Sequence, residues 1–322
     1  MGRNKRSIIF IVEWVMVLMV GVSVVSAASD YPNRYIDLII PYGPGGATDV
    51  ASRLFKDKVE QILGQPIVFS YKPGATGAVG ALYAKGSKPD GYTLLMVSTT
   101  TLILPPLTRK GADYTMEDFA PVCGITYIPQ IFCVKEDSPY KTMADFIQAA
   151  KTKRMKYSTV GAMGISHICM EALSRGAGFQ AIHVPYTTGG AAAMTAVLGG
   201  HVDMSVCGPT GMEQQLRILA VAQQKRWALH PEVPTLKELG YPISGEAYFS
   251  FWAPKGIPKG ISDKIYGAHK KVLGENKEDI TKRANAANQI VSLLDSEELG
   301  KISRDSNEFF KKMIERIGGP IK

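Results

Sequence analysis

The sequence predicts an α/β protein whose two sheets are dominated by parallel strands and carry helices on both faces. Three observations predict this class. Apolar runs with strand character alternate with segments of helical spacing. A glycine-rich loop separates strand from helix at residues 43–48, 74–80 and 161–164. The strands fall into two sets, the second beginning near Ile125, so the loops predict a small anion held between two lobes.

The first strand, loop and helix show the pattern most clearly. Residues 35–40 form an apolar, isoleucine-rich run, and residues 50–63 have helical apolar spacing that ends at Gly64. The first amides of a helix have no internal partner and its dipole is positive there, so the loop suits a carboxylate or a phosphate. A tight turn without a ligand is the alternative. The loop lacks the last glycine of a dinucleotide fingerprint and the Gly-Lys-Ser/Thr end of a P-loop.

The remaining elements continue this alternation. Further strands are predicted at residues 67–71, 92–98, 130–136, 156–160, 181–186, 201–206 and 216–222. Further helices are predicted at residues 81–86 and 141–152, from residue 165, within 187–200, and over most of 262–317. The aromatic and proline-rich segment 245–258 breaks the pattern.

The N-terminus has the layout of a cleavable secretory signal peptide. A basic start is followed by an apolar run and by small residues up to Ala27 and Ala28. Glu13 interrupts the run, and an uncleaved anchor is the competing interpretation. Residues 1–27 are therefore predicted as a signal peptide, and the mature protein is expected in the periplasm.

Charge and cysteine content exclude some classes of function. The formal charge is +8, but lysine and arginine are dispersed and no basic arm, RNP motif or zinc spacing occurs, so no nucleic-acid partner is expected. Export permits disulfides among four cysteines, and buried free thiols are the alternative. These cysteines are Cys123, Cys133, Cys169 and Cys207.

No catalytic or metal motif stands out. The chain has no G-x-S-x-G elbow, H-E-x-x-H helix or kinase set. His167 and Glu171 share a helix face and could be half of a metal site, but a solvated or capped histidine is the simpler interpretation. We predict no enzymatic activity, no cofactor and no metal; a carboxylate-processing enzyme that uses His167 with Glu171 is the alternative.

Six motifs in order resemble the Bug family, the extracytoplasmic solute receptors of tripartite tricarboxylate transporters. The resemblance covers nearly all of residues 31–322. The motifs are "YPNRYIDLIIPYGPGGATDVASRLF", "KPGATGAVGALYAKGSKPDGYTLL", "YSTVGAMGISHICMEAL", "HVPYTTGGAAAMTAVLGGHVD", "LRILAVAQQKRWALHPEVPTLKELG" and "FWAPKGIP".

The resemblance implies a type II, or Venus-flytrap, periplasmic binding-protein fold with a hinge. One lobe would comprise residues 28–124 plus 249–322, and the other residues 125–248. The implied ligand is a small carboxylate: a di- or tricarboxylate, an aromatic carboxylate or an acidic amino acid. The implied partners are a large and a small membrane subunit, with the receptor itself a monomer. A ligand sensor for a membrane signalling partner is the alternative.

The resemblance also implies a ligand site made of three loops. Loop 1 (residues 42–49) and loop 2 (residues 74–77) would contact the carboxylate through amides or bound water, and loop 3 (residues 158–167) would close from the other lobe. With residues at strand ends, the predicted ligand-binding residues are Tyr42, Gly43, Gly45, Gly46, Ala47, Thr48, Asp49, Gly74, Ala75, Thr76, Gly77, Thr99, Thr100, Ser158, Gly161, Ala162, Met163, Gly164, His167, Tyr186 and Cys207.

Several of these positions depart from the family pattern. Tyr42 stands where the family commonly has Phe, Tyr71 and Lys72 where it has Asn and Arg, and Thr188 where it has Gly. Asp49 could accept a ligand ammonium, although an acid in the first turn of a helix more simply complements the dipole. These departures leave the identity of the ligand open.

Overall fold

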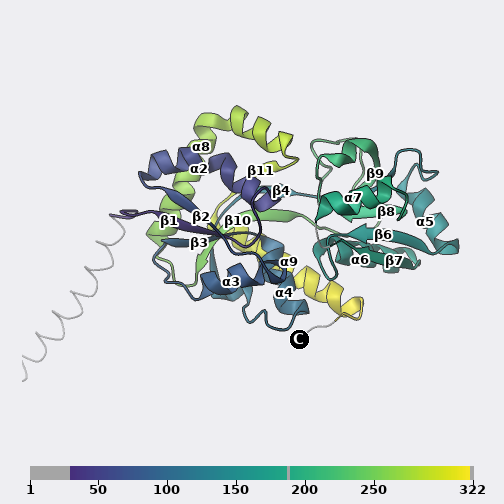
Figure 1. Ribbon diagram of the computed structural model, residues 1–322, viewed down its shortest axis with the longest axis horizontal. Helices are drawn as coiled ribbons and strands as arrows, with labels where there is room; N and C mark the ends of the chain where they lie inside the picture. The colour runs from purple at the N-terminus through teal and green to yellow at the C-terminus, as the bar shows by residue number, and fades with distance from the viewer. Residues whose placement is uncertain (1–29, 187–188, 320–322) are drawn as a thin grey trace, which may run out of the picture.

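Two α/β lobes lie end to end in the computed structural model of this protein, which describes residues 30–186 and 189–319 (Figure 1). The two-lobed α/β class is thereby confirmed. The predicted signal peptide, residues 1–27, lies outside the described residues. Within the described ranges, no helix is both long and apolar enough to cross a membrane.

The sheet of the first lobe, sheet A, has six strands among the described residues, in the order β11-β4-β10-β3-β1-β2. Strand β1 pairs in parallel with β2 and β3, whereas β10 runs antiparallel to β3 and β4, and β11 antiparallel to β4. The strands are β1 (Ile36–Ile40), β2 (Ile67–Tyr71), β3 (Thr93–Ser98), β4 (Phe119–Ile128), β10 (Ala247–Pro254) and β11 (Ile290–Leu294).

The sheet of the second lobe, sheet B, has five strands in the described part of the chain, in the order β7-β6-β8-β5-β9. Strand β6 is parallel to β7 and β8, and β5 is antiparallel to β8 and β9. The strands are β5 (Gln130–Lys135), β6 (Met155–Thr159), β7 (Ala181–Pro185), β8 (Met204–Cys207) and β9 (Leu216–Ala222).

Both sheets are mixed rather than dominated by parallel strands. In sheet A the antiparallel strands are β10 and β11, which, like β4, the sequence patterns did not predict. In sheet B the antiparallel pairs are those of β5 with β8 and β9. Strand β10 lies in segment 245–258, which breaks the alternation of the sequence pattern. It is almost wholly buried, so it has no polar face to give a period of two. In β4, Pro121 lies beside a register shift opposite Trp252, where a proline costs no regular ladder hydrogen bond.

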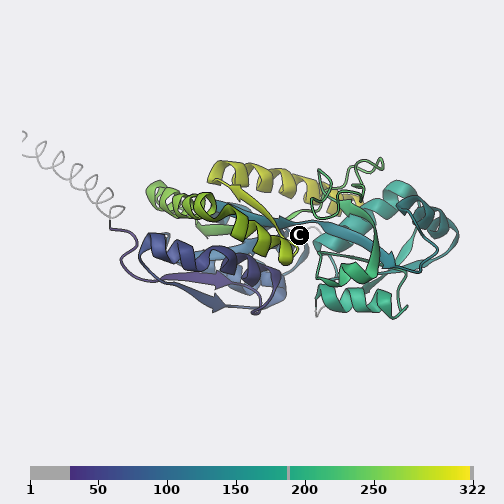
Figure 2. The ribbon, with the colours of Figure 1, turned by 90° about the horizontal axis from the view of Figure 1, so that it is seen from above.

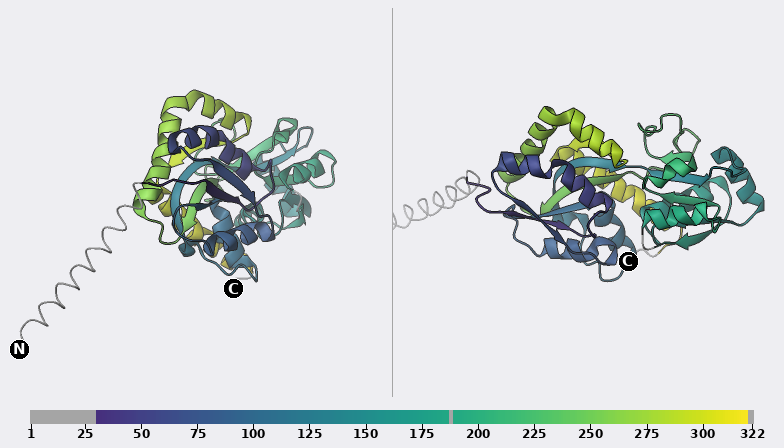
Figure 3. Two further views of the ribbon diagram at one scale, coloured as in Figure 1. Left: turned by 60° about the vertical axis from the view of Figure 1, so that its left-hand side comes forward. Right: turned by 45° about the horizontal axis from the view of Figure 1, so that its top comes forward.

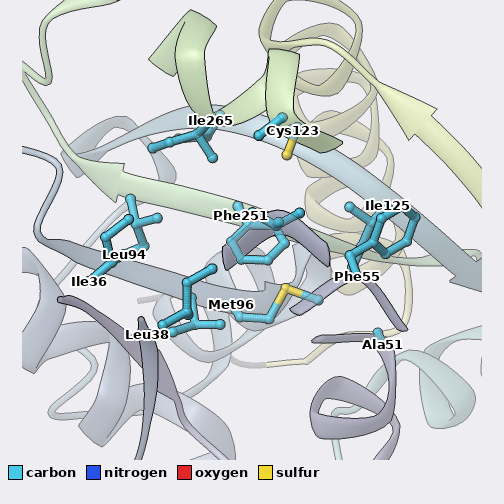
Figure 4. Packing of buried hydrophobic residues seen from close by; sticks show 14 of the residues in the cluster. Ile36, Leu38, Ala51, Phe55, Leu94, Met96, Cys123, Ile125, Phe251 and Ile265 are labelled. Atoms are coloured by element: carbon cyan, nitrogen blue, oxygen red, sulfur yellow. The ribbon is translucent and has the colours of Figure 1, made fainter. Parts of the chain in front are cut away.

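Helices cover both faces of sheet A. Phe55 of α2 (Ala47–Leu63) and Ile265 of α8 (Lys259–Ala286) pack on one face with Leu38 and Phe251, as Figure 4 shows. The opposite face, which includes Ile39, is covered by α3 (Ala78–Lys85), α4 (Thr99–Thr108) and α9 (Ser296–Arg316).

Sheet B is covered in the same way. Helices α5 (Met143–Thr152) and α6 (Ile165–Ala177) pack on one face, and α7 (Gly190–Leu198) packs on the other. Three short 3₁₀ turns complete the described elements, η1 (Ala75–Gly77), η2 (Met116–Asp118) and η3 (Met212–Gln215). Helix α9 reaches from the first lobe to α6, and its Phe310 and Ile314 share a core cluster with Ile168 (Figures 1 and 3).

The chain passes between the sheets at two places. Only Pro129 separates β4 from β5, and residues 223–246 lead from β9 back to β10 (Figure 2). Residues 125–128, which the sequence prediction gave to the second lobe, continue β4 in sheet A. We propose that these two crossings form the hinge and mark the boundaries of the lobes.

All four cysteines are buried and free. Burial raises the pKa of the Cys207 thiol to about 12 and that of Cys169 further. The thiols therefore behave as small apolar core groups, which decides between the two interpretations that the sequence left open.

Candidate functional site

The strand directions bring the predicted loops to the junction between the lobes. Because β3 and β4 are both antiparallel to β10, β4 runs parallel to β1, β2 and β3. The C-terminal end of β4 leads directly into sheet B, so loops 1 and 2 lie at the edge of sheet A that faces sheet B. Strands β6, β7 and β8 run antiparallel to β5, which starts at this crossing, so loop 3 lies at the facing edge of sheet B.

Loop 1 is held in shape by Asp49, whose side chain is buried in the first turn of α2. Its carboxylate accepts hydrogen bonds from the Gly45 amide at 2.9 Å, the Arg53 Nε at 2.9 Å and the Tyr71 hydroxyl at 2.7 Å. Burial raises the pKa of Asp49, but the hydrogen bonds from Arg53, Gly45 and Tyr71 outweigh burial and leave the pKa below its ordinary value. The carboxylate thus fixes the loop, and its oxygens are already engaged with donors of the protein.

The start of α2 presents the amides that the sequence analysis singled out. Gly46 is the N-cap residue and has no side-chain cap, and the Val50 amide is the first to bond back, to the Gly46 carbonyl. The amides of residues 47–49 therefore have no partner within the helix. Gln289, which the sequence analysis missed, donates through Nε2 to the Ala47 carbonyl at 2.8 Å.

Loop 2 has a backbone conformation that residues other than glycine rarely adopt. Four successive residues have positive φ: Gly74 (139°), Ala75 (47°), Thr76 (57°) and Gly77 (91°). A Cβ at Gly77 would lie 2.5 Å from Thr101 Cγ2, so this glycine is required by space as well as by φ. Such strain is maintained only where surrounding contacts hold it, and it is typical of ligand sites.

Tyr42 connects loops 1 and 2. Its hydroxyl donates to the Thr76 carbonyl at 3.3 Å and accepts from Thr101 Oγ1 at 2.8 Å. The family resemblance implies that this extra hydroxyl lies near the ligand. The structure assigns it a contact between the two loops, and Thr101 is a partner that no local pattern marked.

Thr99 and Thr100 begin α4 rather than end a strand. Thr100 Oγ1 lies 2.8 Å from Ser98 Oγ, whereas the Thr99 hydroxyl is buried and has no hydrogen-bond partner among the described residues. Local sequence patterns do not predict this helix, because Pro105 and Pro106 lie inside it. An unpaired buried hydroxyl is costly, so Thr99 is a candidate contact for a ligand group or a water.

Loop 3 turns through Gly161 (φ 84°) and Met163 (φ 57°) before α6 begins. Thr159 Oγ1 donates to the Gly161 carbonyl at 3.0 Å, and the Met163 amide donates to His167 Nδ1 at 3.1 Å. The Met163 side chain packs with the cluster that contains α4 and α9 of the first lobe. Loop 3 therefore contacts the opposite lobe directly.

Other predicted residues face the interior of the second lobe. Ser158 is fully buried and its hydroxyl donates to the Ala193 carbonyl at 2.8 Å. Cys207 is also fully buried, 3.6 Å from Ser205 Oγ. Tyr186 is half-buried and its amide donates to the Thr159 carbonyl. The departure at Thr188 lies outside the described residues.

Three cavities lie away from these loops. The first, of about 460 Å³, is lined by Lys151, Lys153, Arg154 and Arg175. The second, of about 440 Å³, lies between Leu229 and the α8–β11 surface, and the third, of about 380 Å³, is beside Tyr31. Within the described ranges, no group of three or more His, Cys, Asp or Glu residues is placed to hold a metal ion.

The chain resembles known solute receptors over most of its length. The family model described as "Tripartite tricarboxylate transporter family receptor" matches residues 51–318. A protein of Cupriavidus necator, named "UPF0065 protein in gbd 5'region", is 38% identical over 258 residues, which are 76% of each chain. Protein BugT of Bordetella pertussis is 30% identical over 264 residues, 78% of each chain.

Solved structures agree with this similarity. The crystal structure of a TctC solute-binding protein from Polaromonas superimposes with a TM-score of 0.76 at 29% sequence identity. The match covers 89% of this chain and 99% of that one. The similarity therefore extends over both lobes.

Proposed function

Because the chain belongs to the family of tripartite tricarboxylate transporter receptors, we propose that it is an exported receptor that captures a small carboxylate between its lobes. It would deliver this ligand, unchanged, to a large and a small membrane subunit. We further propose that the receptor is periplasmic and monomeric, with residues 1–27 removed on export.

The observation that carries this proposal is the convergence of the loops at the junction between the sheets. The unpaired first-turn amides of α2 and the strained backbone of loop 2 belong to one lobe, and loop 3 belongs to the other. A charge-assisted hydrogen bond from an amide to a carboxylate is worth about 1.5–3 kcal/mol. Shifting a hinge from mostly open to mostly closed takes roughly 5 kcal/mol of differential affinity, so it requires bonds that the ligand makes with loop 3 only in the closed form.

A binding screen with a matched pair of variants tests the proposal. Small carboxylates, including adipate, malate, citrate, benzoate and glutamate, are added to the mature protein, and thermal shift and calorimetry are measured. We expect stoichiometric binding of at least one acid, a higher melting temperature and no turnover. No stabilisation by any carboxylate would contradict the proposal.

Gly45→Ala and Gly111→Ala form the matched pair. Both glycines have positive φ, 79° and 83°, and neither would have a neighbour within 4 Å of an added Cβ. Both variants should lose about 1 kcal/mol of stability through the same backbone strain. Only Gly45→Ala, in loop 1, should weaken binding of the acid; equal affinities in the two variants would exclude loop 1 from the site.

A further inference from the structure

Two histidine rings are stacked directly behind loop 3. The ring centroids of His167, on α6, and His183, on β7, are 4.0 Å apart with an interplanar angle of 22°. The ring of Tyr157, on β6, stacks on His183 at 5.1 Å. Each of the two histidines holds a different point of the loop.

The hydrogen bonds of His167 fix where its proton lies. The Met163 amide donates to Nδ1, so Nδ1 must carry a lone pair and the neutral ring must carry its proton on Nε2. Nε2 lies 3.9 Å from Glu171 Oε1, which also accepts the Tyr157 hydroxyl at 2.7 Å. This arrangement allows His167 to hold the Met163 amide only while the ring is neutral.

The hydrogen bonds of His183 fix its proton in the same way. Thr159 uses its hydroxyl proton on the Gly161 carbonyl, so the proton between Thr159 Oγ1 and His183 Nε2, 2.6 Å apart, belongs to the histidine. A chain of donors thus runs from His183 through Thr159 to the backbone of loop 3. The two rings together hold the carbonyl of residue 161 and the amide of residue 163, on either side of the turn.

We propose that His167 and His183 are positioning residues for loop 3, and that protonation of His167 on acidification releases the Met163 side of the turn. A proton added to His183 goes to Nδ1 and leaves its bond to Thr159 in place. Through loop 3 the two histidines would make ligand capture depend on pH, a consequence that rests on the proposed function. A proton added to His167 must go to Nδ1, where it displaces the bond from Met163. Because Met163 has the strained φ of 57°, the turn loses the contact that maintains it.

The surroundings of the pair favour the neutral rings. Burial lowers the pKa of His167, and the negative charge of Glu171 opposes this effect. Burial and the neighbouring His167 lower the pKa of His183 to about 4. Among the described residues, Glu171 on α6 and Tyr157 on β6 also face the stack. The pair is therefore neutral at pH 7.

Nuclear magnetic resonance of the ligand-free mature protein tests the assignment. At about pH 7.5 the ring nitrogen shifts of His167 should identify an unprotonated Nδ1, and the Met163 amide should exchange slowly. On titration to about pH 4.5, protonation of His167 and loss of Met163 protection should share one midpoint. A protonated Nδ1 at pH 7.5, or a Met163 amide that stays protected after the ring titrates, would overturn the proposal.

Three variants separate positioning from simple packing. In His167→Asn the amide oxygen replaces Nδ1 as acceptor and cannot titrate, so Met163 protection should persist at both pH values. His167→Phe keeps an aromatic ring without an acceptor, and protection should be lost already at pH 7.5. His230→Gln changes a half-buried histidine paired with Glu232, away from loop 3, and should behave as the wild type. If the Phe and Asn variants behave alike, His167 only fills space.

Adipate binding then tests the consequence for capture. Between about pH 7.5 and 4.5 the wild type should lose roughly tenfold more affinity than His167→Asn, a typical coupling between two sites. Protonation of adipate itself affects both proteins equally and cancels in this comparison. Equal pH dependence would contradict the link to capture. If neither protein binds any carboxylate, the proposed function fails, whereas the ligand-free measurements still decide the role of the histidines.

Discussion

Gln289 and Ala47 are 242 positions apart in the chain, yet the Gln289 amide donates to the Ala47 carbonyl at 2.8 Å. The other end of the same amide accepts from Thr126 Oγ1 at 2.7 Å. The buried side chain of Gln289, directly before β11, thus joins the first residue of α2 to β4. Strand β4 is the strand that leads from sheet A into sheet B. The proposed ligand-binding end of α2 and the proposed hinge are therefore joined by one side chain.

Gln289→Met should therefore be destabilising, although it keeps the volume of the side chain. It leaves the buried Thr126 hydroxyl and the Ala47 carbonyl without these partners, at a cost of about 1–3 kcal/mol. Gln223→Met is the matched control, because the Gln223 amide is buried and has no partner among the described residues. It should be neutral or stabilising. Urea unfolding measures both variants, and equal effects would deny Gln289 this role.

Tyr42→Phe should loosen loop 2 from loop 1. The variant removes the hydrogen bond to Thr76 and leaves Thr101 Oγ1 without its acceptor, with an expected cost of about 1 kcal/mol. Hydrogen exchange should increase at residues 74–77, and carboxylate affinity should fall. Tyr35→Phe, at an exposed tyrosine, should change neither quantity. Unchanged exchange in loop 2 would show that Tyr42 does not hold it.

Asp49→Asn should cost about 1–3 kcal/mol of unfolding free energy at pH 7, because the bond from Arg53 loses its charge assistance. The folded pKa of Asp49 is lowered, so its contribution is present above the unfolded value and is lost as pH falls through the folded pKa. The difference from wild type should therefore shrink below about pH 4. Asp57→Asn, at an exposed acid on the same helix, should show no difference.

A pH-independent difference at Asp49→Asn would contradict a role for its charge. The same variant addresses the ligand. Three protein donors already occupy the Asp49 carboxylate. The affinity of Asp49→Asn for acids with an ammonium group and for acids without one should therefore change by the same factor.

His269 should make the first lobe sensitive to acid. The ring is buried on α8 between Phe55 and Phe251, with centroids 5.6 and 4.7 Å away, and burial lowers its pKa to about 4. The unfolded chain binds the proton first, so stability falls as pH drops from about 6.5 towards 4, by up to about 3 kcal/mol. His269→Phe should flatten this dependence in urea unfolding at several pH values.

The exposed His201→Asn variant is the control for His269 and should retain the full acid dependence. A wild type whose stability does not change between about pH 6.5 and 4 would contradict the burial argument. Some dependence should remain in His269→Phe, because His167 and His183 also have lowered pKa values.

Local patterns in the sequence were sufficient for much of the fold. The apolar run before loop 1, the helical spacing after it and the glycine at residue 64 predicted β1 and α2, and Gly64 does have a φ of 73°. Such features depend on neighbours within a few residues, so they can be read without the fold. The glycine-rich loops were recognised for the same reason, because only glycine readily adopts positive φ.

Features that depend on distant partners could not be predicted in this way. Strand β10 is buried on both faces, and only its pairing with β3 and β4 makes it a strand. Likewise, the role of Asp49 is decided by Arg53 and Tyr71, which donate hydrogen bonds to its carboxylate. Gln289 and His183 carried no signal, because each acts on a residue brought close only by folding.

The sequence by itself determined the family, the order of strand, loop and helix, and the positions of the glycine-rich loops. Tertiary structure decided which side chains hold those positions in place and which predicted contacts, such as Ser158 and Cys207, face the core instead. The physical reason is the range of the interactions. Backbone conformation is set by adjacent residues, whereas buried hydrogen bonds are made between groups that the chain brings together only when it is folded.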